Sequence, residues 1–225
     1  MTGTLYIVAT PIGNLKDTTF RAIETLKSVD MIACEDTRHT KKLLVHYNIS
    51  KPLTSYFEYN KVKKGEYLAG LLKEGKNIAL VSDSGTPGIS DPGFKIINLA
   101  IKENIPVNII PGPCAFISAL VVSGMPTDSF VFHGFLSNKG AKRKNQLSSL
   151  KEEKKTIILY ESPHRLLKLL EDILGVLGDR ELAISRELTK IYEETIRLTT
   201  SQAIKHFTAK LPKGEFVVII RGSLT

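Results

Sequence analysis

The segment VSDSGTPGISDPG, residues 81–93, combines three glycines and two prolines within thirteen residues. It follows an apolar run typical of a buried strand and precedes residues 94–102, where apolar residues recur at helical spacing. Ser90 or Asp91 is expected to cap that helix, with Pro92 in its first turn. Strand-to-helix connections usually span about 2–6 residues, and ligands bind where parallel strands end. This longer loop is therefore predicted to bind a ligand.

Two further loops rich in glycine and proline follow strand-like runs. Residues 10–14 (TPIGN) follow the run at 4–9, and residues 111–114 (PGPC) follow the run at 107–110. Between them, apolar runs alternate with amphipathic helical patterns, which favours an α/β domain with a largely parallel sheet. Because parallel strands end at the same edge of a sheet, we expect the three loops to converge on one cleft.

The rest of the chain predicts a second α/β domain. Residues 193–199 alternate polar and apolar side chains and are expected to pair with the run at 181–185. We place the boundary after the helical segment 115–123. The predicted fold thus has a mostly parallel N-terminal domain, residues 1–124, and a C-terminal domain with a mixed sheet, residues 125–225.

Composition narrows the functional classes. The two cysteines lack CxxC spacing, which argues against a disulfide framework or zinc site and fits a reducing cytoplasm. The five histidines are scattered without metal-ligand spacing, so we expect no metal. No apolar run reaches membrane-spanning length, and the N-terminus lacks the basic region of a signal peptide. We therefore expect a cytoplasmic protein with no membrane partner.

The charge favours an anionic partner. The net charge is +8 and the isoelectric point about 9.4, which indicates nucleic acid first, although a lysine-rich proteome is an alternative explanation. Residues 139–155 carry seven lysines or arginines against two glutamates, and residues 34–42 (CEDTRHTKK) concentrate charge at a strand end. The latter segment fits either a capped, solvated helix start or the edge of a site. The candidate RNA contacts are Arg38, Lys41, Lys42, Lys142, Arg143 and Lys144.

Common nucleotide-binding motifs are missing. The sixteen glycines form no GxG pair, so the dinucleotide fingerprint and the glycine-rich loop of Rossmann-type methyltransferases are absent. Residues 70–76 spell GxxxxGK, but Asn77 replaces the required Ser or Thr, and the segment runs from helix to strand. We interpret it as a chance match.

Six motifs in order resemble those of the 16S rRNA cytidine 2′-O-methyltransferases of the tetrapyrrole methylase superfamily. They are ATPIGNLKD (9–17), CEDTR (34–38), VSDSGTPGISDPG (81–93), PGPCA (111–115), YESPHR (160–165) and RELTKIYEE (186–194). The resemblance covers essentially the whole chain, with Cys34 and Ser84 standing where alanine is common. It implies two α/β domains with S-adenosylmethionine (SAM) in the cleft between them, and a homodimer in the bacterial cytoplasm. The implied reaction is 2′-O-methylation of a cytidine ribose in 16S rRNA within the small ribosomal subunit.

The same resemblance implies a set of cofactor contacts. For SAM these are Pro11, Ile12, Gly13, Ser84, Gly85, Thr86, Pro87, Ile89, Pro113, Cys114, Ala115, Tyr160, Glu161 and Leu188. A ribose hydroxyl is a weak nucleophile, so a general base helps, typically by about 10²–10⁴-fold. The candidates are Glu35, Asp36, Asp83, Glu161 and Lys190, and the sequence does not choose among them. Glu35 and Asp36 are expected beside the loop at residues 10–14 if sequential strands are neighbours in the sheet.

Two other functions stay open at this point. One is SAM-dependent methylation of a tetrapyrrole by the same fold. The basic tract and the segments CEDTRHTKK and GTPGISDPG argue against it. The other is a non-enzymatic RNA-binding module. The three convergent loops argue against it, because they predict a small-molecule site. DNA is not an expected partner.

Overall fold

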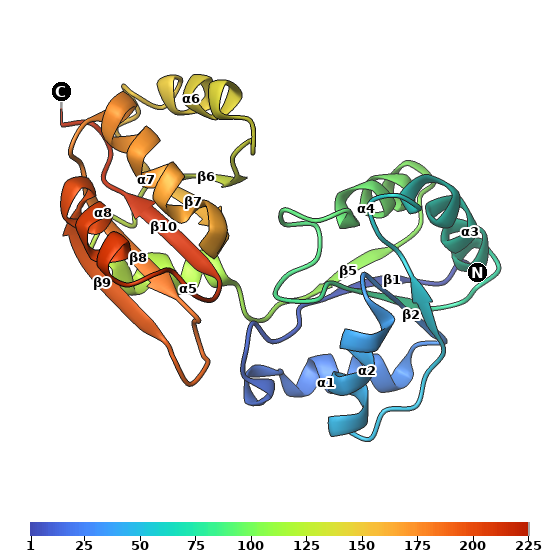
Figure 1. Cartoon of the computed structure of the whole chain (residues 1–225). Helices are drawn as coiled ribbons and strands as arrows, with labels where there is room; N and C mark the ends of the chain where they lie inside the picture. The colour runs from blue at the N-terminus through green and yellow to red at the C-terminus, as the bar shows by residue number, and fades with distance from the viewer. Residues whose placement is uncertain (225) are drawn as a thin grey trace. The chain divides into compact units, whose positions relative to one another are not determined.

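The computed structural model describes residues 1–224 and divides into two compact units (Figure 1). The first comprises Met1–Cys114, and the second begins at Ala115. Each has its own five-stranded sheet. Within the described residues, no helix is both long and apolar enough to cross a membrane.

The first unit contains a fully parallel sheet in the order β3-β2-β4-β1-β5. The strands are three or four residues long, and the three central ones are apolar and almost wholly buried, as expected of strands covered on both faces. The strands are β1 (Leu5–Val8), β2 (Met31–Cys34), β3 (Leu53–Ser55), β4 (Ile78–Val81) and β5 (Val107–Ile110). The helices are the 3-10 turn η1 (Leu15–Asp17), α1 (Phe20–Ser28), α2 (Thr37–His46), α3 (Lys61–Lys73) and α4 (Gly93–Lys102).

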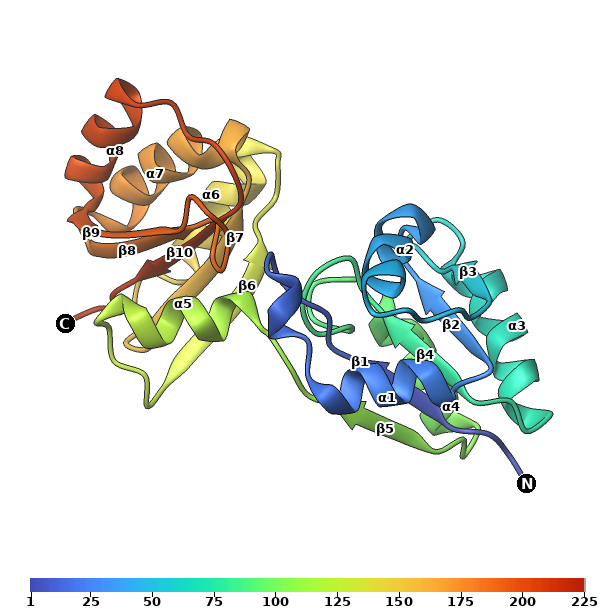
Figure 2. The ribbon, with the colours of Figure 1, turned by 90° about the horizontal axis from the view of Figure 1, so that it is seen from below.

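Alternation along the strands divides the first core into two layers. Ile78 and Leu80 of β4 pack with side chains of α3 and α4, whereas Ala79 and Val81 pack with those of α1 and α2. Figure 2 shows the strands of this unit with the helix pairs on either side. The helices cover both faces, which leaves the ends of the strands as the place where loops gather.

The strand order corrects one expectation about neighbours. β4 lies between β1 and β2, so the first two strands do not pair. The loop after β2, which carries Glu35 and Asp36, is therefore beside the loop after β4 and not beside the loop after β1. A crossover of this kind leaves no local signal, because β1, β2 and β4 are all short apolar runs.

The second unit contains a mixed sheet in the order β6-β7-β10-β8-β9. β6 and β7 are parallel, and the other pairs are antiparallel, including the predicted hairpin of β8 and β9. Its strands are β6 (Phe130–Phe135), β7 (Thr156–Glu161), β8 (Glu181–Arg186), β9 (Glu194–Thr199) and β10 (Phe216–Ile220), and its helices are α5 (Ala115–Ser123), α6 (Gly140–Ser148), α7 (Pro163–Leu177) and α8 (Thr200–Ala209). The predicted parallel and mixed sheets are thus confirmed.

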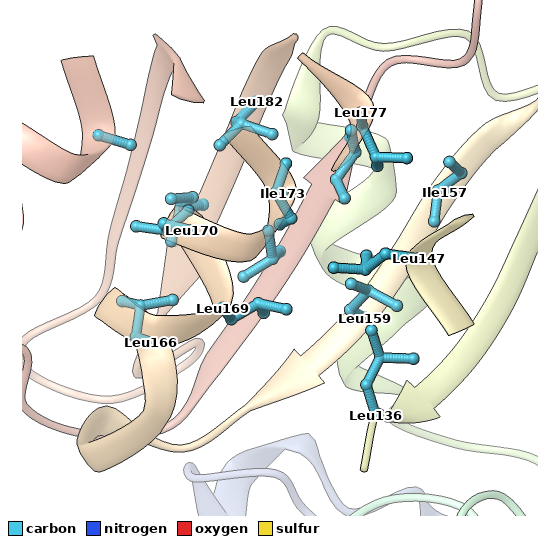
Figure 3. Packing of buried hydrophobic residues seen from close by; sticks show 14 of the residues in the cluster. Leu136, Leu147, Ile157, Leu159, Leu166, Leu169, Leu170, Ile173, Leu177 and Leu182 are labelled. Carbon is cyan, nitrogen blue, oxygen red and sulfur yellow. The ribbon is translucent and has the colours of Figure 1, made fainter. Parts of the chain in front are cut away.

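The core of the second unit is centred on α7 (Figure 3). Leu166, Leu169, Leu170 and Ile173 recur at helical spacing, and all are at most 1% exposed. They pack against the strands, and Leu147 of α6 joins the same cluster. A single apolar stripe on α7 therefore holds the sheet and the basic helix together.

Helix α5 belongs to the second unit. The boundary along the chain therefore falls between Cys114 and Ala115 and not after residue 124. This helix is apolar on nearly all sides and contacts β7, β8, β9 and β10. The glycine at its end, Gly124, has a φ of 77°, which stops the helix as predicted from the sequence. That stop signal sets the end of the helix but says nothing about which sheet the helix covers.

Candidate cofactor and substrate site

Loops after β1 and β4 are joined directly by their main chains. The amide of Thr10 donates to the Gly85 carbonyl at 2.9 Å, and the amide of Gly85 donates back to the Thr10 carbonyl at 3.1 Å. The Thr10 hydroxyl also donates to the Ser82 carbonyl at 3.1 Å. Gly85 has a φ of 83°, a conformation that disfavours any residue with a Cβ. The sequence of the loop thus permits this contact between two strand ends.

The loop after β5 meets the other two. The Thr86 hydroxyl donates to the Pro113 carbonyl at 3.3 Å. A Cβ at Gly112 would lie 3.0 Å from the Ala9 Cβ, and one at Gly85 would lie 3.5 Å from the Ile12 side chain. The three loops therefore converge, as their position on a parallel sheet predicts.

The β4–α4 loop is held by one carboxylate. Asp91 Oδ1 accepts the amide protons of Gly88 at 2.8 Å and Gly93 at 2.7 Å. A Cβ at Gly93 would lie 2.8 Å from that same oxygen, so glycine is required for this close approach. Burial raises the pKa of Asp91, although both amide hydrogen bonds oppose the shift. Asp91 is thus a structural residue of the loop, with α4 beginning at Gly93.

Asp36 caps helix α2 and holds Arg38. Its Oδ1 accepts the Arg38 amide at 2.8 Å, and its two oxygens accept the Arg38 guanidinium at 3.1 and 2.8 Å. These bonds hold the pKa of Asp36 well below its usual range. The Asp36 amide donates to Asp83 Oδ1 at 3.0 Å, which joins the β2 and β4 loops. A carboxylate that is so strongly stabilised in its ionised form is a weak proton acceptor.

Glu35 has the opposite electrostatic environment. It lines a small pocket together with Tyr56, Ser82 and Asp91. Desolvation raises its pKa, and the neighbouring carboxylates of Asp83 and Asp91 raise it further. A carboxyl group with a raised pKa is better matched to accept a proton near neutral pH. Of the two acids that follow β2, Glu35 is therefore the better candidate for a general base, because its pKa is raised and that of Asp36 is lowered.

In the second unit, Glu161 ends β7 as a buried carboxylate. Its side chain has no exposed surface, and its Oε1 lies 3.1 Å from Arg165 Nε and accepts the Ser162 amide at 2.8 Å. Its Oε2 is buried without a hydrogen-bond partner among the residues that the structure describes. Burial raises the pKa of Glu161, against the effects of Ser162 and Arg165.

Two other implied cofactor contacts of the second unit, Tyr160 and Leu188, lie near strand ends. The ring of Tyr160 lies 5.0 Å from that of Phe132 and 5.6 Å from that of Phe135, both on β6. Leu188 is buried after β8. These implied cofactor contacts therefore lie at the ends of β7 and β8, where ligands commonly bind in α/β sheets.

Lys190 is held in its charged form. Partial burial lowers its pKa, but Glu215 and Glu187, at 2.8 and 2.9 Å from Nζ, raise it above the usual range overall. A lysine that stays protonated cannot accept a proton from a hydroxyl. Lys190 is therefore the least suitable of the candidate bases.

The basic tract divides into a buried arginine and exposed lysines. Arg143, expected to contact RNA, is 6% exposed, and its Nε donates to Asp172 Oδ2 at 2.7 Å. That expectation is wrong, because the guanidinium joins α6 to α7. Lys142 is exposed on the same helix, and Lys144 is also exposed, with its Nζ 3.5 Å from Asp172 Oδ1. Adjacent residues of a helix face different directions, and the sequence showed no partner for Arg143 because Asp172 lies far along the chain.

The other predicted RNA contacts lie on α2. Arg38 is exposed but already paired with Asp36, and Lys41 and Lys42 are exposed further along the helix. Across residues 1–224, no group of three or more His, Cys, Asp or Glu side chains is arranged to hold a metal ion.

Comparisons with known proteins place this geometry in context. The family model described as Tetrapyrrole (Corrin/Porphyrin) Methylases matches residues 4–204. A protein of Synechocystis sp. named Ribosomal RNA small subunit methyltransferase I is 54% identical over 98% of this chain and 80% of its own length. A protein of Thermotoga maritima with the same name is 50% identical over 98% of this chain and 99% of its own length.

Solved structures with this fold are more distant in sequence. Uroporphyrin-III-C-methyltransferase from Thermus thermophilus has a TM-score of 0.68 at 19% identity and covers 96% of this chain and 94% of its own. A diphthine synthase has a TM-score of 0.73 at 14% identity and covers 99% of this chain and 92% of its own. These likenesses show the fold alone.

Replacing Arg143 with alanine should destabilise the second unit. The change leaves Asp172 as a buried charge without its closest partner, which costs about 3–5 kcal/mol. Chemical denaturation should detect this loss, whereas the Lys142→Ala control should change stability by less than about 0.5 kcal/mol. The paired variant Arg143→Leu with Asp172→Leu should recover much of the lost stability, because it removes both charges. Equal stability of Arg143→Ala and wild type would contradict the structural role.

Proposed function

Because this chain belongs to the tetrapyrrole (corrin/porphyrin) methylase family, we propose that it is a SAM-dependent methyltransferase acting on 16S rRNA of the small ribosomal subunit. The carrying observation is 50–54% identity along 98% of the chain to two proteins named Ribosomal RNA small subunit methyltransferase I. The finer proposal is methylation of a cytidine ribose at its 2′ oxygen. The net charge of +8 supports an RNA substrate over a tetrapyrrole.

The convergent loops of the first unit fit SAM chemically. Residues 10–14, 84–89 and 111–115 contain no charged side chain, and their contacts place main-chain groups and small side chains together. The acids Asp83 and Asp91 lie in the loop after β4, at the same edge of the sheet, and suit a ligand with a sulfonium and an ammonium group. When bound, SAM supplies the methyl group. In the proposal, Pro11, Ile12, Gly13, Ser84, Gly85, Thr86, Pro87, Ile89, Pro113, Cys114 and Ala115 hold it.

Residues of the second unit complete this proposed site. The buried Oε2 of Glu161 is an acceptor for which an N–H or O–H of a bound ligand is a suitable partner. Tyr160, which is half-buried, and Leu188, which is buried, lie near the ends of their strands and are the proposed apolar contacts. The same unit contributes the exposed lysines of α6 for phosphate contacts.

We further propose that the protein is a homodimer in the bacterial cytoplasm.

For proton removal we propose Glu35. Its position directly after β2, beside Asp83 and Asp91, gives it a raised pKa next to the loop that carries Thr86. Asp36 instead serves as the cap of α2 and the partner of Arg38. Alignment of the 2′ oxygen with the methyl carbon supplies the rest of the acceleration.

The direct test incubates the protein and SAM with small subunits that lack the modification. Mass mapping of the rRNA should locate one added methyl group on a cytidine ribose. A methyl group on the base would contradict the finer proposal, and no methylation of the subunits would contradict the broader one. A parallel incubation with a tetrapyrrole measures the alternative substrate.

Replacing Thr86 with tryptophan should abolish SAM binding. Thr86 lies where the loop after β4 meets the loop after β5, so an indole ring there fills the proposed site. Isothermal titration calorimetry should show no SAM binding by this variant, while circular dichroism shows the wild-type fold. Thr208→Trp, on an exposed turn of α8, is the matched control and should bind normally. Unchanged affinity in folded Thr86→Trp would remove the loops from the cofactor site.

Glu35→Gln should slow methylation by about 10²-fold or more with SAM affinity unchanged. Because the pKa of Glu35 is raised, the wild-type rate should increase with pH as this carboxyl loses its proton, and Gln should remove that increase. Asp36→Asn retains a capping side chain and should keep a rate within a few-fold of wild type. The reverse pattern, a slow Asp36→Asn and a normal Glu35→Gln, would assign the base to Asp36.

The double variant Lys142→Ala with Lys144→Ala should weaken binding to the small subunit. Each lost phosphate contact reduces the slope of log affinity against log salt by about 1. Filter binding across a salt series measures this slope, and SAM affinity should stay the same. A slope equal to that of wild type would show that these lysines form only a solvated face.

A further inference from the structure

The connection between β8 and β9 exposes two large apolar side chains side by side. Ile191 is 95% exposed and Tyr192 is 71% exposed, whereas Leu188, three residues earlier, is only 9% exposed. Figure 1 shows this connection as the orange loop beyond the ends of the two strands. Aromatic residues such as tyrosine are enriched at interaction sites relative to the rest of a protein surface.

The backbone of this loop is fixed from both ends. The Glu187 amide donates to the Glu215 carbonyl at 3.1 Å, and the Glu215 amide donates to Glu187 Oε1 at 3.1 Å. The Thr189 amide donates to Glu193 Oε2 at 2.5 Å. Glu187 and Thr189 have φ values of 50° and 67°, which persist only where surrounding contacts impose them. The exposed tip is therefore held in place by the segment that precedes β10.

The acids around the tip already have partners. Lys190 Nζ lies 2.9 Å from Glu187 Oε1 and 2.8 Å from Glu215 Oε2. Arg186 Nε lies 2.7 Å from Glu194 Oε2. Lys190 thus faces two glutamates, so these ion pairs reduce the negative charge of the acids around Tyr192 without cancelling it.

Two further lysines lack such partners. Lys210 and Lys213 lie in the segment that leads into β10, both are exposed, and neither has an ion-pair partner within the described chain. The hydrogen bonds of Glu215 attach this segment to the loop that carries Tyr192. The loop and the segment attached to it thus combine a fixed aromatic side chain with two exposed lysines that form no ion pair among the described residues.

We propose that Tyr192, flanked by Ile191, stacks on an unpaired base of the rRNA substrate, while Lys210 and Lys213 contact its phosphates. This inference rests on the proposed function and assigns residues for substrate recognition that are not among the proposed cofactor contacts. Proteins that bind single-stranded RNA combine aromatic platforms with basic residues along the backbone of the strand. A tyrosine on a fixed hairpin loses little conformational freedom when a base stacks on it.

The test compares tyrosine variants in binding to small subunits that lack the methyl group. Tyr192→Ala should weaken binding by about 5- to 150-fold, the range measured for a single stacked base. Tyr192→Phe and Tyr192→Trp should bind within about 3-fold of wild type, because they keep an aromatic face. Tyr59→Ala, at a 95% exposed tyrosine of the first unit, is the matched control and should bind normally.

Salt dependence separates the aromatic contact from the charged ones. Tyr192→Ala should keep the wild-type slope of log affinity against log salt, whereas Lys210→Ala with Lys213→Ala should reduce it by up to about 2. SAM affinity, measured by calorimetry, should be the same in all these variants.

Several results would overturn this inference while leaving the proposed function intact. They are normal binding by Tyr192→Ala, an equal loss in Tyr192→Phe, or a change in oligomeric state of Tyr192→Ala by sedimentation, which would assign the tip to a second copy of the chain. If wild-type protein neither binds nor methylates small subunits, the proposed function itself fails, and the stacking role fails with it.

Discussion

The pair of main-chain hydrogen bonds between Thr10 and Gly85 determines how the first unit presents its loops. It joins the ends of β1 and β4, and the next residue, Thr86, then contacts the loop after β5. Each of these contacts uses a backbone group on at least one side. The geometry of the site consequently depends on backbone conformation, with Gly85 and Gly93 supplying conformations or close approaches that other residues resist. Such a frame can hold a ligand without a glycine-rich nucleotide fingerprint.

The two units use charged residues in different ways. In the first, carboxylates gather where strands end. Desolvation raises the pKa of Glu35, and the nearby charges of Asp83 and Asp91 raise it further. In the second, Arg143 and Arg165 lie beside Asp172 and Glu161, and Arg165 donates to the Leu136 carbonyl at 2.6 Å. These pairs anchor both ends of the segment from β6 to α6. On α6, the positive charge that reaches solvent is that of Lys142 and Lys144.

Local patterns were sufficient to predict most elements and the convergence of the three loops. Apolar runs, capping residues and the glycine and proline stops act within a few residues, and parallel strands necessarily end at one edge. The position of β4 between β1 and β2 depends on crossovers, which leave no such signal. Helix α5 is apolar on nearly every side, so its sequence fits either sheet equally well. The sequence wrongly predicts an RNA contact at Arg143, because it shows a positive charge but not the distant Asp172 that pairs with it. The choice between Glu35 and Asp36 required the neighbours that fold around them.

The position of β1 inside the first sheet has a consequence for folding during synthesis. Leu5 pairs on one side with Ile78 and on the other with Val107, near the end of that unit. The strand made first must therefore wait for the strands made last before either of its edges is satisfied. Contacts between residues so far apart in sequence form slowly, because the chain must close long loops before gaining them. Until β5 leaves the ribosome, the apolar residues of β1 are a surface on which chaperones can act and on which incomplete chains can associate.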